Sequence, residues 1–178
     1  MTVGVFFNGQ EIIEVGQEWY DLLKHHALQA ERKRSRLCLH HTPDDLLHEM
    51  IIVFHRDTII RPHRHLNKSE SCHVIFGELD IVLFDDDGRA TRVISLGEVG
   101  SGKTHVYRLS DPVWHSVIIQ SEFAAIHEVT NGPFREEESD FAPWTPADPV
   151  ELRRFLARSV STAPREARKP TSEIKSSA

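Results

Sequence analysis

Hydrophobic and polar positions follow two different patterns along this chain of 178 residues. Over residues 17–34, apolar side chains recur at helical spacing and basic residues gather at the end, so this segment predicts a short amphipathic helix. Between Met50 and Thr130, short runs rich in Val, Ile and Phe alternate with turns that contain Asp, Gly, Asn or Pro. About eight strands are expected there, the usual number for a jelly roll or a small antiparallel barrel.

Turn and cap residues indicate where these elements end. Gly77-Glu78 and residues 86–88 predict hairpin turns between strands. Residues 148–158 predict a last short helix, which Asp148 caps and which has a proline in its first turn. Beyond Ser159 the sequence has no apolar periodicity, and we expect it to be disordered.

The expected fold class is therefore all-β, with a short helix before the barrel and a disordered C-terminal tail. A length of 178 residues fits one domain with appended segments. We divide the chain into an N-terminal extension (1–16), a β-barrel domain with its N-terminal helix (17–146), and a short helix with a tail (147–178).

Composition excludes several classes of function. The net charge is -6 and the pI is about 6.0, so a general attraction to nucleic acid or to anionic lipid is not expected. The N-terminus lacks a basic region and a long apolar run, and no stretch is long enough for a transmembrane helix. With two cysteines, Cys38 and Cys72, the chain does not resemble a secreted disulfide scaffold. We expect a cytoplasmic protein with a small-molecule partner.

Twelve histidines direct attention to metal chemistry, and three of them stand in a suggestive pattern. His63 and His65 lie two apart, so on a strand they face the same side. Glu70 follows after a short turn, and His115 opens another apolar strand. Three imidazoles and one carboxylate suit Zn, Fe, Mn, Ni or Co better than Ca or Mg, and four protein ligands leave a position for water or substrate.

Two other interpretations of these motifs must be weighed. In a chain with twelve histidines, one pair of this spacing arises readily by chance, and it is the addition of Glu70 and His115 on a strand-rich pattern that favours a metal site. Residues 97–104, GEVGSGKT, match the phosphate-binding P-loop. That loop needs a helix after it, whereas the residues that follow are β-branched and aromatic at alternate positions, so a glycine-rich turn between strands is expected.

The stretch RPHRHLNKSESCHVIFGE resembles the first motif of the cupin superfamily, and His115 resembles the histidine of the second motif. Together with Glu128-Val129-Thr130 and residues 132–134, it is similar to the WbuC-type cupin metalloproteins over about residues 17–146. Two positions depart from the general cupin pattern: Asp57 replaces a glycine, and residues 111–115 replace the second motif's usual sequence. The resemblance implies a cupin barrel, a divalent transition metal and a homodimer.

Four further residues are candidates for catalysis or substrate binding. Arg61 has the strand parity of the two histidines, so we expect it to face inward and to bind a phosphate or carboxylate, or else to form a structural ion pair. Glu128 is a candidate general base or partner of a ligand histidine. Lys103 and Arg108 are candidate substrate-binding residues.

Three functions remain open at this point. The first is a metal-dependent enzyme, similar to an isomerase or epimerase, that acts on a small sugar or nucleotide sugar. The WbuC resemblance implies this substrate class, because that family is often encoded among genes for surface polysaccharide synthesis. The second is an iron or nickel dioxygenase, which the same ligand set supports. The third is a non-catalytic, metal-stabilised barrel that binds a ligand.

Overall fold

Two facing β-sheets form the body of the protein in the computed structural model, which describes residues 4–135 and 138–164. One sheet has six strands in the order β1-β2-β3-β10-β5-β8, and the other has five in the order β11-β4-β9-β6-β7. The bounds of the elements are β1 Val5–Phe7, α1 Gln17–Gln29, β2 Arg34–Cys38, β3 Leu47–His55, β4 His63–His65, β5 Glu70–Phe76, β6 Glu78–Phe84, β7 Ala90–Gly97, β8 Val106–Leu109, β9 Trp114–Ile119, β10 Phe123–Asn131, β11 Ser139–Phe141 and α2 Pro149–Thr162.

The expected all-β barrel is confirmed. Eight strands, β3 to β10, occupy the region in which about eight were expected, and neighbouring strands pair antiparallel except β1 with β2. The segment expected to be an N-terminal extension supplies β1, whose Phe6 lies opposite Leu37 of β2. No helix among the described residues is long and apolar enough to cross a membrane.

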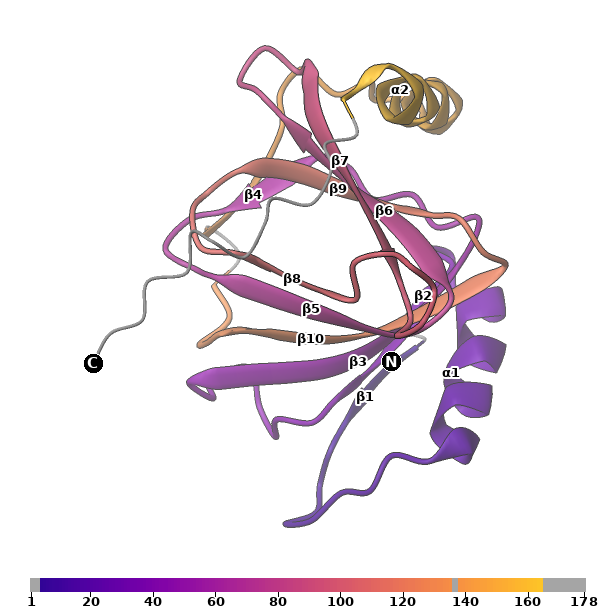
Figure 1. Ribbon diagram of the computed structural model, residues 1–178. Coiled ribbons are helices and arrows are strands. Elements are labelled where there is room, and N and C mark those ends of the chain that lie inside the picture. The colour runs from indigo at the N-terminus through magenta and orange to yellow at the C-terminus, as the bar shows by residue number, and fades with distance from the viewer. Residues whose placement is uncertain (1–3, 136–137, 165–178) are drawn as a thin grey trace, which may run out of the picture.

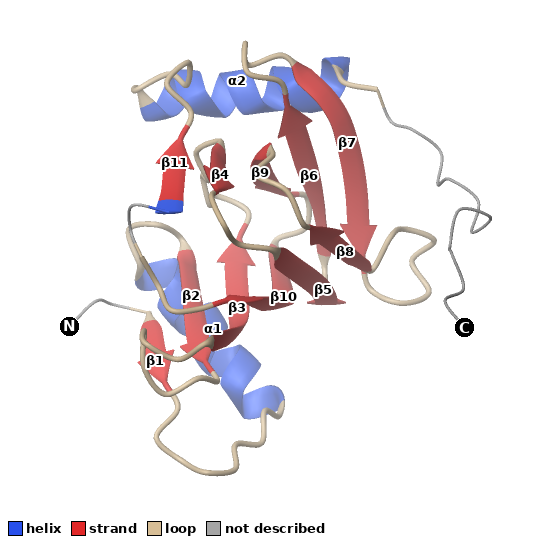
Figure 2. Cartoon of the chain, turned by 90° about the vertical axis from the view of Figure 1, so that its left-hand side faces the viewer, coloured by secondary structure: helices blue, strands red, loops and turns tan. Residues whose placement is uncertain are grey.

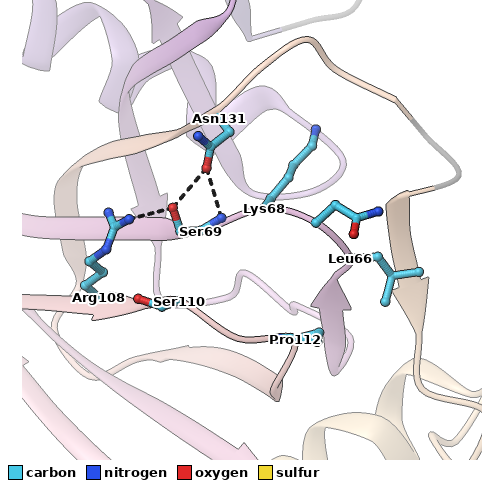
Figure 3. Close-up of a pocket in the computed structure, with 8 residues that line it drawn as sticks. Leu66, Lys68, Ser69, Arg108, Ser110, Pro112 and Asn131 are labelled. Carbon is cyan, nitrogen blue, oxygen red and sulfur yellow. Dashed lines mark hydrogen bonds between the residues drawn. The ribbon is translucent and has the colours of Figure 1, made fainter.

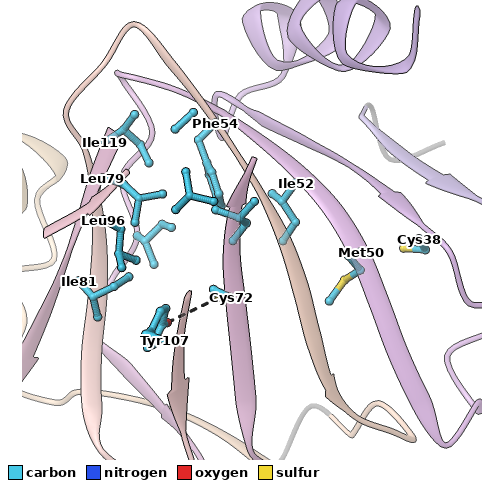
Figure 4. Packing of buried hydrophobic residues seen from close by; sticks show 14 residues of the cluster. Cys38, Met50, Ile52, Phe54, Cys72, Leu79, Ile81, Leu96, Tyr107 and Ile119 are labelled. Carbon is cyan, nitrogen blue, oxygen red and sulfur yellow. Dashed lines mark hydrogen bonds between the residues drawn. The ribbon is translucent and has the colours of Figure 1, made fainter. Parts of the chain in front are cut away.

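Apolar side chains of the two sheets fill the space between them. Phe54 and Ile119 lie at one end of the cluster, and Cys72, Tyr107 and Met50 lie toward the other end (Figure 4). Because side chains alternate along a strand, every second residue of β3, β5, β6 and β10 points into this core. The cysteines at positions 38 and 72 are buried free thiols.

The two helices cover the outer faces of the sheets (Figures 1 and 2). Helix α1 packs Leu23 and Ala27 against β2 and β3, and it ends at Gln29 instead of residue 34. It ends early because Ala30 is extended and Lys33 has a positive φ of 53°, after which the chain enters β2.

Helix α2 extends to Thr162, so the expectation of disorder directly after Ser159 is wrong for residues 160–162. Leu152, Leu156 and Ser159 are buried, which means that the last turn has a packed face. Asp148 caps the helix as expected, because its side chain accepts hydrogen bonds from the amides of residues 150 and 151. The rest of the expected tail, residues 165–178, lies outside the described residues.

The P-loop pattern at residues 97–104 does not form a phosphate-binding loop. Gly97 ends β7, a turn follows, and the chain enters strand β8 at Val106 with no helix between them. The loop therefore lacks the helix N-terminus that would hold phosphates, as the sequence pattern predicted.

Of the two expected hairpin turns, only that around residues 86–88 is correct, since it joins the paired strands β6 and β7. Gly77 lies between β5 and β6, which belong to different sheets, so it forms a corner. Its φ is +79°, and a Cβ atom there would collide with the backbone carbonyl oxygen of Phe123. The glycine is needed because the chain must turn sharply against a neighbouring backbone.

We predict that Gly77→Ala lowers the free energy of unfolding by at least about 2 kcal/mol, because it adds a backbone collision to the left-handed conformation. Urea unfolding followed by circular dichroism measures this change. Gly100→Ala is the matched control, since its φ is +93° but nothing lies within 4 Å of the added Cβ, and we expect a loss of about 1 kcal/mol. Equal losses in the two variants would contradict the proposed role of the corner.

Candidate metal centre

The inner face of the six-stranded sheet is polar at one end of the barrel and apolar toward the other. Strand register places side chains of neighbouring strands in rows across this face. The first row contains Glu70, Thr130 and His48; the second contains Tyr107, Cys72, Glu128, Met50 and Cys38; the third contains Val74, Ile126, Ile52 and Arg36. The polar end lies opposite the part of the second sheet that carries the predicted metal ligands.

Three predicted ligands come from two neighbouring strands of the five-stranded sheet. His63 and His65 lie on β4 and share one face, because they are two residues apart on a strand. His115 lies on β9 directly opposite His63 and is 2% exposed. One ring nitrogen from each of the three histidines lies within 4.8 Å of the other two. The structure therefore brings the three imidazoles together.

Backbone carbonyls set the orientation of two of these rings. The Nδ1 atom of His63 is 2.9 Å from the carbonyl oxygen of Arg61, and the Nδ1 atom of His115 is 2.9 Å from that of Val113. A carbonyl oxygen can only accept, so each Nδ1 carries a hydrogen, and in the neutral ring the lone pair is then on Nε2. This arrangement is typical of metal-binding histidines.

The carboxylate of Glu70 faces the same point from the opposite sheet. Its Oε2 atom is 3.3 Å from His65 Nε2 and 3.9 Å from His115 Nε2. Its Oε1 atom accepts a 2.7 Å hydrogen bond from the hydroxyl of Tyr107. Burial acts to raise the pKa of Glu70, but the hydrogen bond from His65, the charge of His115 and the hydrogen bond from Tyr107 outweigh it and lower the pKa to about 2.

The protonation state of His63 fits a ligand of a divalent transition metal. Burial, followed by the neighbouring His115, lowers the pKa of His63 to about 3, so this imidazole is neutral near pH 7. Metal ligation requires neutral imidazoles and an ionised carboxylate. The donor set of His63, His65, His115 and Glu70 therefore suits the predicted metal in chemistry as well as in position.

A second group of potential ligands lies beside the first. Oxygen and sulfur atoms of Glu70, Cys72 and Glu128 lie within 4.8 Å of one another. The thiol of Cys72 is 3.6 Å from Glu70 Oε1 and 3.7 Å from the hydroxyl of Tyr107. Burial and the nearby carboxylates raise the pKa of Cys72 well above its ordinary value, so it stays a thiol and is a weak metal ligand.

Glu128 is the second carboxyl group inside the barrel and behaves in the opposite way to Glu70. Burial, followed by the charge of Glu70, raises the pKa of Glu128 to about 8. Two neighbouring carboxyl groups are therefore held in different protonation states, as in sites that combine a charged ligand with a proton donor.

A cavity of about 330 Å³ begins at these groups and opens to the surface. His65, Glu70 and Glu128 line its inner part. Phe7 and Phe134, which are 46% and 52% exposed, lie at its outer part. The other residues that line it are Arg36, Cys38, His40, Pro43, His48, Met50, Lys68, Thr130 and Ser139. The cavity has room for a small molecule next to the histidine cluster.

The expectation that Arg61 faces inward is wrong. Strand β4 begins at His63, so the alternation of side chains does not extend back to Arg61. Its side chain is exposed, donates to the hydroxyl of Thr145 and lies 5.1 Å from the ring of Phe141. Arg61 contributes to the centre through its backbone carbonyl, which holds the ring of His63.

The two other basic candidates also lie outside the cavity. Arg108 follows the inward-facing Tyr107, so it points outward and donates hydrogen bonds to Ser69 and Ser71. It lines a separate outer depression of about 470 Å³ with Ser69 and Asn131 (Figure 3). Lys103 forms an ion pair with Glu78 of β6. Leu83 of the same strand lies opposite His115, and five residues separate Glu78 from Leu83 along β6, so Glu78 is roughly 16 Å from the level of His115.

Sequence reasoning did not single out Tyr107, although the structure shows it donating to Glu70. Register could have suggested it, because Tyr107 lies opposite Cys72 and shares the inward face of Glu70. Arg36 was also missed. It lies on β2, three strands from β5 in the sheet, and nothing local in the sequence marks it.

Comparison with known sequences gives one match over part of the chain. A family model described as a domain of unknown function (DUF6016) matches residues 15–96. No curated protein matches the sequence at a significant level.

Comparison with solved structures identifies the fold. The chain is similar to the polyketide cyclase RemF from Streptomyces resistomycificus, with a TM-score of 0.54, 16% identity, and coverage of 74% of this chain and 84% of RemF. It is also similar to oxalate decarboxylase from Bacillus subtilis, with a TM-score of 0.47, 17% identity and coverage of 81% and 40%. A third is a cupin-superfamily sugar phosphate isomerase from Silicibacter pomeroyi, with a TM-score of 0.43, 17% identity and coverage of 56% and 59%. The expected cupin barrel is confirmed at the level of the fold.

We predict that Tyr107→Phe lowers the metal affinity roughly ten- to hundredfold, because Glu70 loses the hydroxyl that orients its carboxylate. Competition with a chromogenic chelator measures the affinity. Tyr20→Phe is the control, since Tyr20 lies on α1 against Phe76, on the outer face of the sheet. An unchanged affinity in the Tyr107 variant would show that the hydroxyl does not support the ligand.

Proposed function

We propose that this chain is a metal-dependent enzyme with a cupin fold that isomerises or epimerises a small sugar or nucleotide sugar. One observation carries the proposal: a cavity of about 330 Å³ is lined by His65 and Glu70 of the ligand set and by Glu128, whose pKa is raised to about 8. The pairing of a metal-ligand set with a proton-carrying group suits a reaction that moves a proton next to an oxygen.

His63, His65, His115 and Glu70 would hold the metal. When bound there, a divalent transition metal would supply polarisation of a carbonyl or hydroxyl oxygen of the substrate. The four side chains come from both sheets, so the barrel fixes their mutual positions without help from the substrate.

Glu128 is the residue that we assign to proton transfer. Isomerisation of a sugar carbonyl removes a proton from the carbon next to it and returns a proton to a neighbouring carbon or oxygen, so it needs no oxidant. Glu128 lies on the cavity wall, and with a pKa of about 8 part of it is ionised near neutral pH. The ionised form would take up the proton from carbon, and the protonated form would return it. Burial is the first cause of this shift, and the charge of Glu70 is the second.

The proposal of a sugar-type substrate and of a role in surface polysaccharide synthesis rests on sequence motifs. Residues 61–65 and Glu128-Val129-Thr130 are similar to those of WbuC-type cupins. The names of the similar structures include a sugar phosphate isomerase, which agrees with this substrate class without carrying the argument. We propose a homodimer on the same resemblance.

A dioxygenase remains the second candidate, because three histidines and one glutamate also suit non-haem iron or nickel. Cleavage by oxygen does not require a protonated carboxyl group on the cavity wall, so the position and pKa of Glu128 favour proton transfer.

We expect the purified protein to hold roughly one equivalent of metal, and we predict that the double variant His63→Ala/His65→Ala loses at least about nine tenths of it, because two of four ligands are removed. Elemental analysis measures the metal, and circular dichroism checks that a β protein remains. His73→Ala is the matched control, because His73 is exposed on the outer face of β5 and should keep its metal. Full metal retention in the double variant would overturn the ligand set.

We predict that Glu128→Gln reduces proton exchange at least a hundredfold and leaves the metal content unchanged, because the amide keeps the shape of the side chain and cannot transfer a proton. The assay incubates the metal-loaded protein with hexose phosphates and nucleotide sugars in D2O and follows deuterium at carbon by NMR. Absence of exchange by the wild type, with oxygen consumption instead, would support the dioxygenase. Absence of both would support a ligand-binding barrel.

A further inference from the structure

Arg36 is an exposed residue on the wall of the cavity, and it forms no ion pair within the described part of the chain, although its charge acts on Glu128. It lies on β2, on the same face as Cys38 and Met50, and lines the cavity that contains His65 and Glu70. Its guanidinium lies 3.8 Å from the sulfur of Met50, and no carboxylate of residues 4–135 or 138–164 lies within 4.0 Å of it. An arginine without a carboxylate partner has its fork of donors available for an anion.

The other charged groups of the cavity are already compensated or neutral. Lys68 forms a 3.2 Å ion pair with Glu138 and lies 5.5 Å from the ring of Phe134. Burial lowers the pKa of His40, so this imidazole is neutral near pH 7. The carboxylate of Glu70 faces His65 and His115, so it belongs to the metal centre. The cavity thus has one cation available at its outer part and one predicted metal centre at its inner part.

The separation of these two features defines the size of a ligand that could reach both. Strands β10 and β3 lie between β5, which carries Glu70, and β2, which carries Arg36, so the two backbones are roughly 14 Å apart across the sheet. The side chain of Arg36 reaches back toward Met50, which lies opposite Glu128. A small molecule with an anionic group at one end fits this span better than an isolated ion does.

We propose that Arg36 binds the anionic group, a carboxylate or phosphate, of a substrate whose other end presents an oxygen atom to the metal centre. This inference rests on the proposed function and specifies its substrate class: a small acid or sugar phosphate with two separated oxygen-bearing ends. Met50, with Phe7 and Phe134 at the outer part, provides the apolar contacts between the two ends.

The test measures binding of defined probes to the purified protein with its metal by isothermal titration calorimetry. The probes are glutarate and adipate, which carry two carboxylates, the phosphonate analogue of glutarate, and valerate, which carries one carboxylate. We expect Arg36→Met to weaken binding of the dianionic probes roughly ten- to hundredfold, since one charge-assisted hydrogen-bonding partner is lost. Valerate can place its one carboxylate at the metal or at Arg36 but not at both, so it should bind more weakly than the dianionic probes and lose less affinity in the variant.

Arg108→Met is the matched control, because Arg108 is an exposed arginine of the same sheet whose side chain points outward. It should bind the probes as the wild type does. Arg36→Lys should restore part of the affinity, since it keeps the charge and loses the fork. A preference for the phosphonate over glutarate would identify a phosphate substrate, and the reverse preference would identify a dicarboxylate.

Metal content, measured on every sample, separates this inference from the proposed function. Equal affinity of wild type and Arg36→Met at full metal content would overturn the role of Arg36 and leave the metal centre standing. Failure of the metal-loaded wild type to bind any dianionic probe would also overturn the proposed role of Arg36. If the wild type holds no metal, the proposed function fails, and loss of dicarboxylate binding in the metal-free variant would still establish the anion site.

Discussion

The buried carboxylate of Glu70 is the interaction on which the candidate site depends. It lies on β5 of one sheet, faces His65 and His115 of the other, and accepts a hydrogen bond from Tyr107. An ionised carboxylate is costly to bury without partners, so these contacts are needed to keep it charged. The same contacts connect the two sheets at the end of the barrel where the cavity opens. The charge of Glu70 therefore links the stability of this end of the barrel to its capacity for metal binding.

Burial and the charge of Glu70 together determine the protonation state of the neighbouring Glu128. Glu128 lies within 4.8 Å of Glu70, and two ionised carboxylates so close in a buried place would repel strongly. Since Glu70 has the hydrogen-bond donors, Glu128 retains the proton. A difference in hydrogen bonding between two identical side chains thus gives one the role of a ligand and the other the role of a proton carrier. Burial, followed by the charges of Glu70 and Glu128, raises the pKa of Cys72, so it also stays protonated.

The sequence predicts the barrel, its strand-rich region and the grouping of the histidines, because these depend on local spacing. His63 and His65 share a face on any strand, and the alternation holds as long as the strand does. The same argument failed for Arg61, because β4 begins only at His63, and sequence does not locate the start of a strand within two residues. Gly77 was mistaken for a hairpin because a sharp turn within one sheet and a corner between two sheets use the same residue. Arg36 and Tyr107 were out of reach because their positions depend on which distant strands pair.

The site is assembled from segments far apart in the chain, and this limits what a partial sequence match can mean. The family model covers residues 15–96, which include Arg36, His63, His65 and Glu70. Tyr107, His115 and Glu128 lie beyond it, on β8, β9 and β10. These strands return to pair with β4, β5 and β6, so the first half of the chain cannot complete the ligand set or the second carboxyl group without them. A chain that kept the histidine pair and lost the pairing of β9 with β4 would retain the motif and lose the centre. The histidine motif alone therefore does not show that a metal centre is present. Strand pairing must also bring His115 beside the motif.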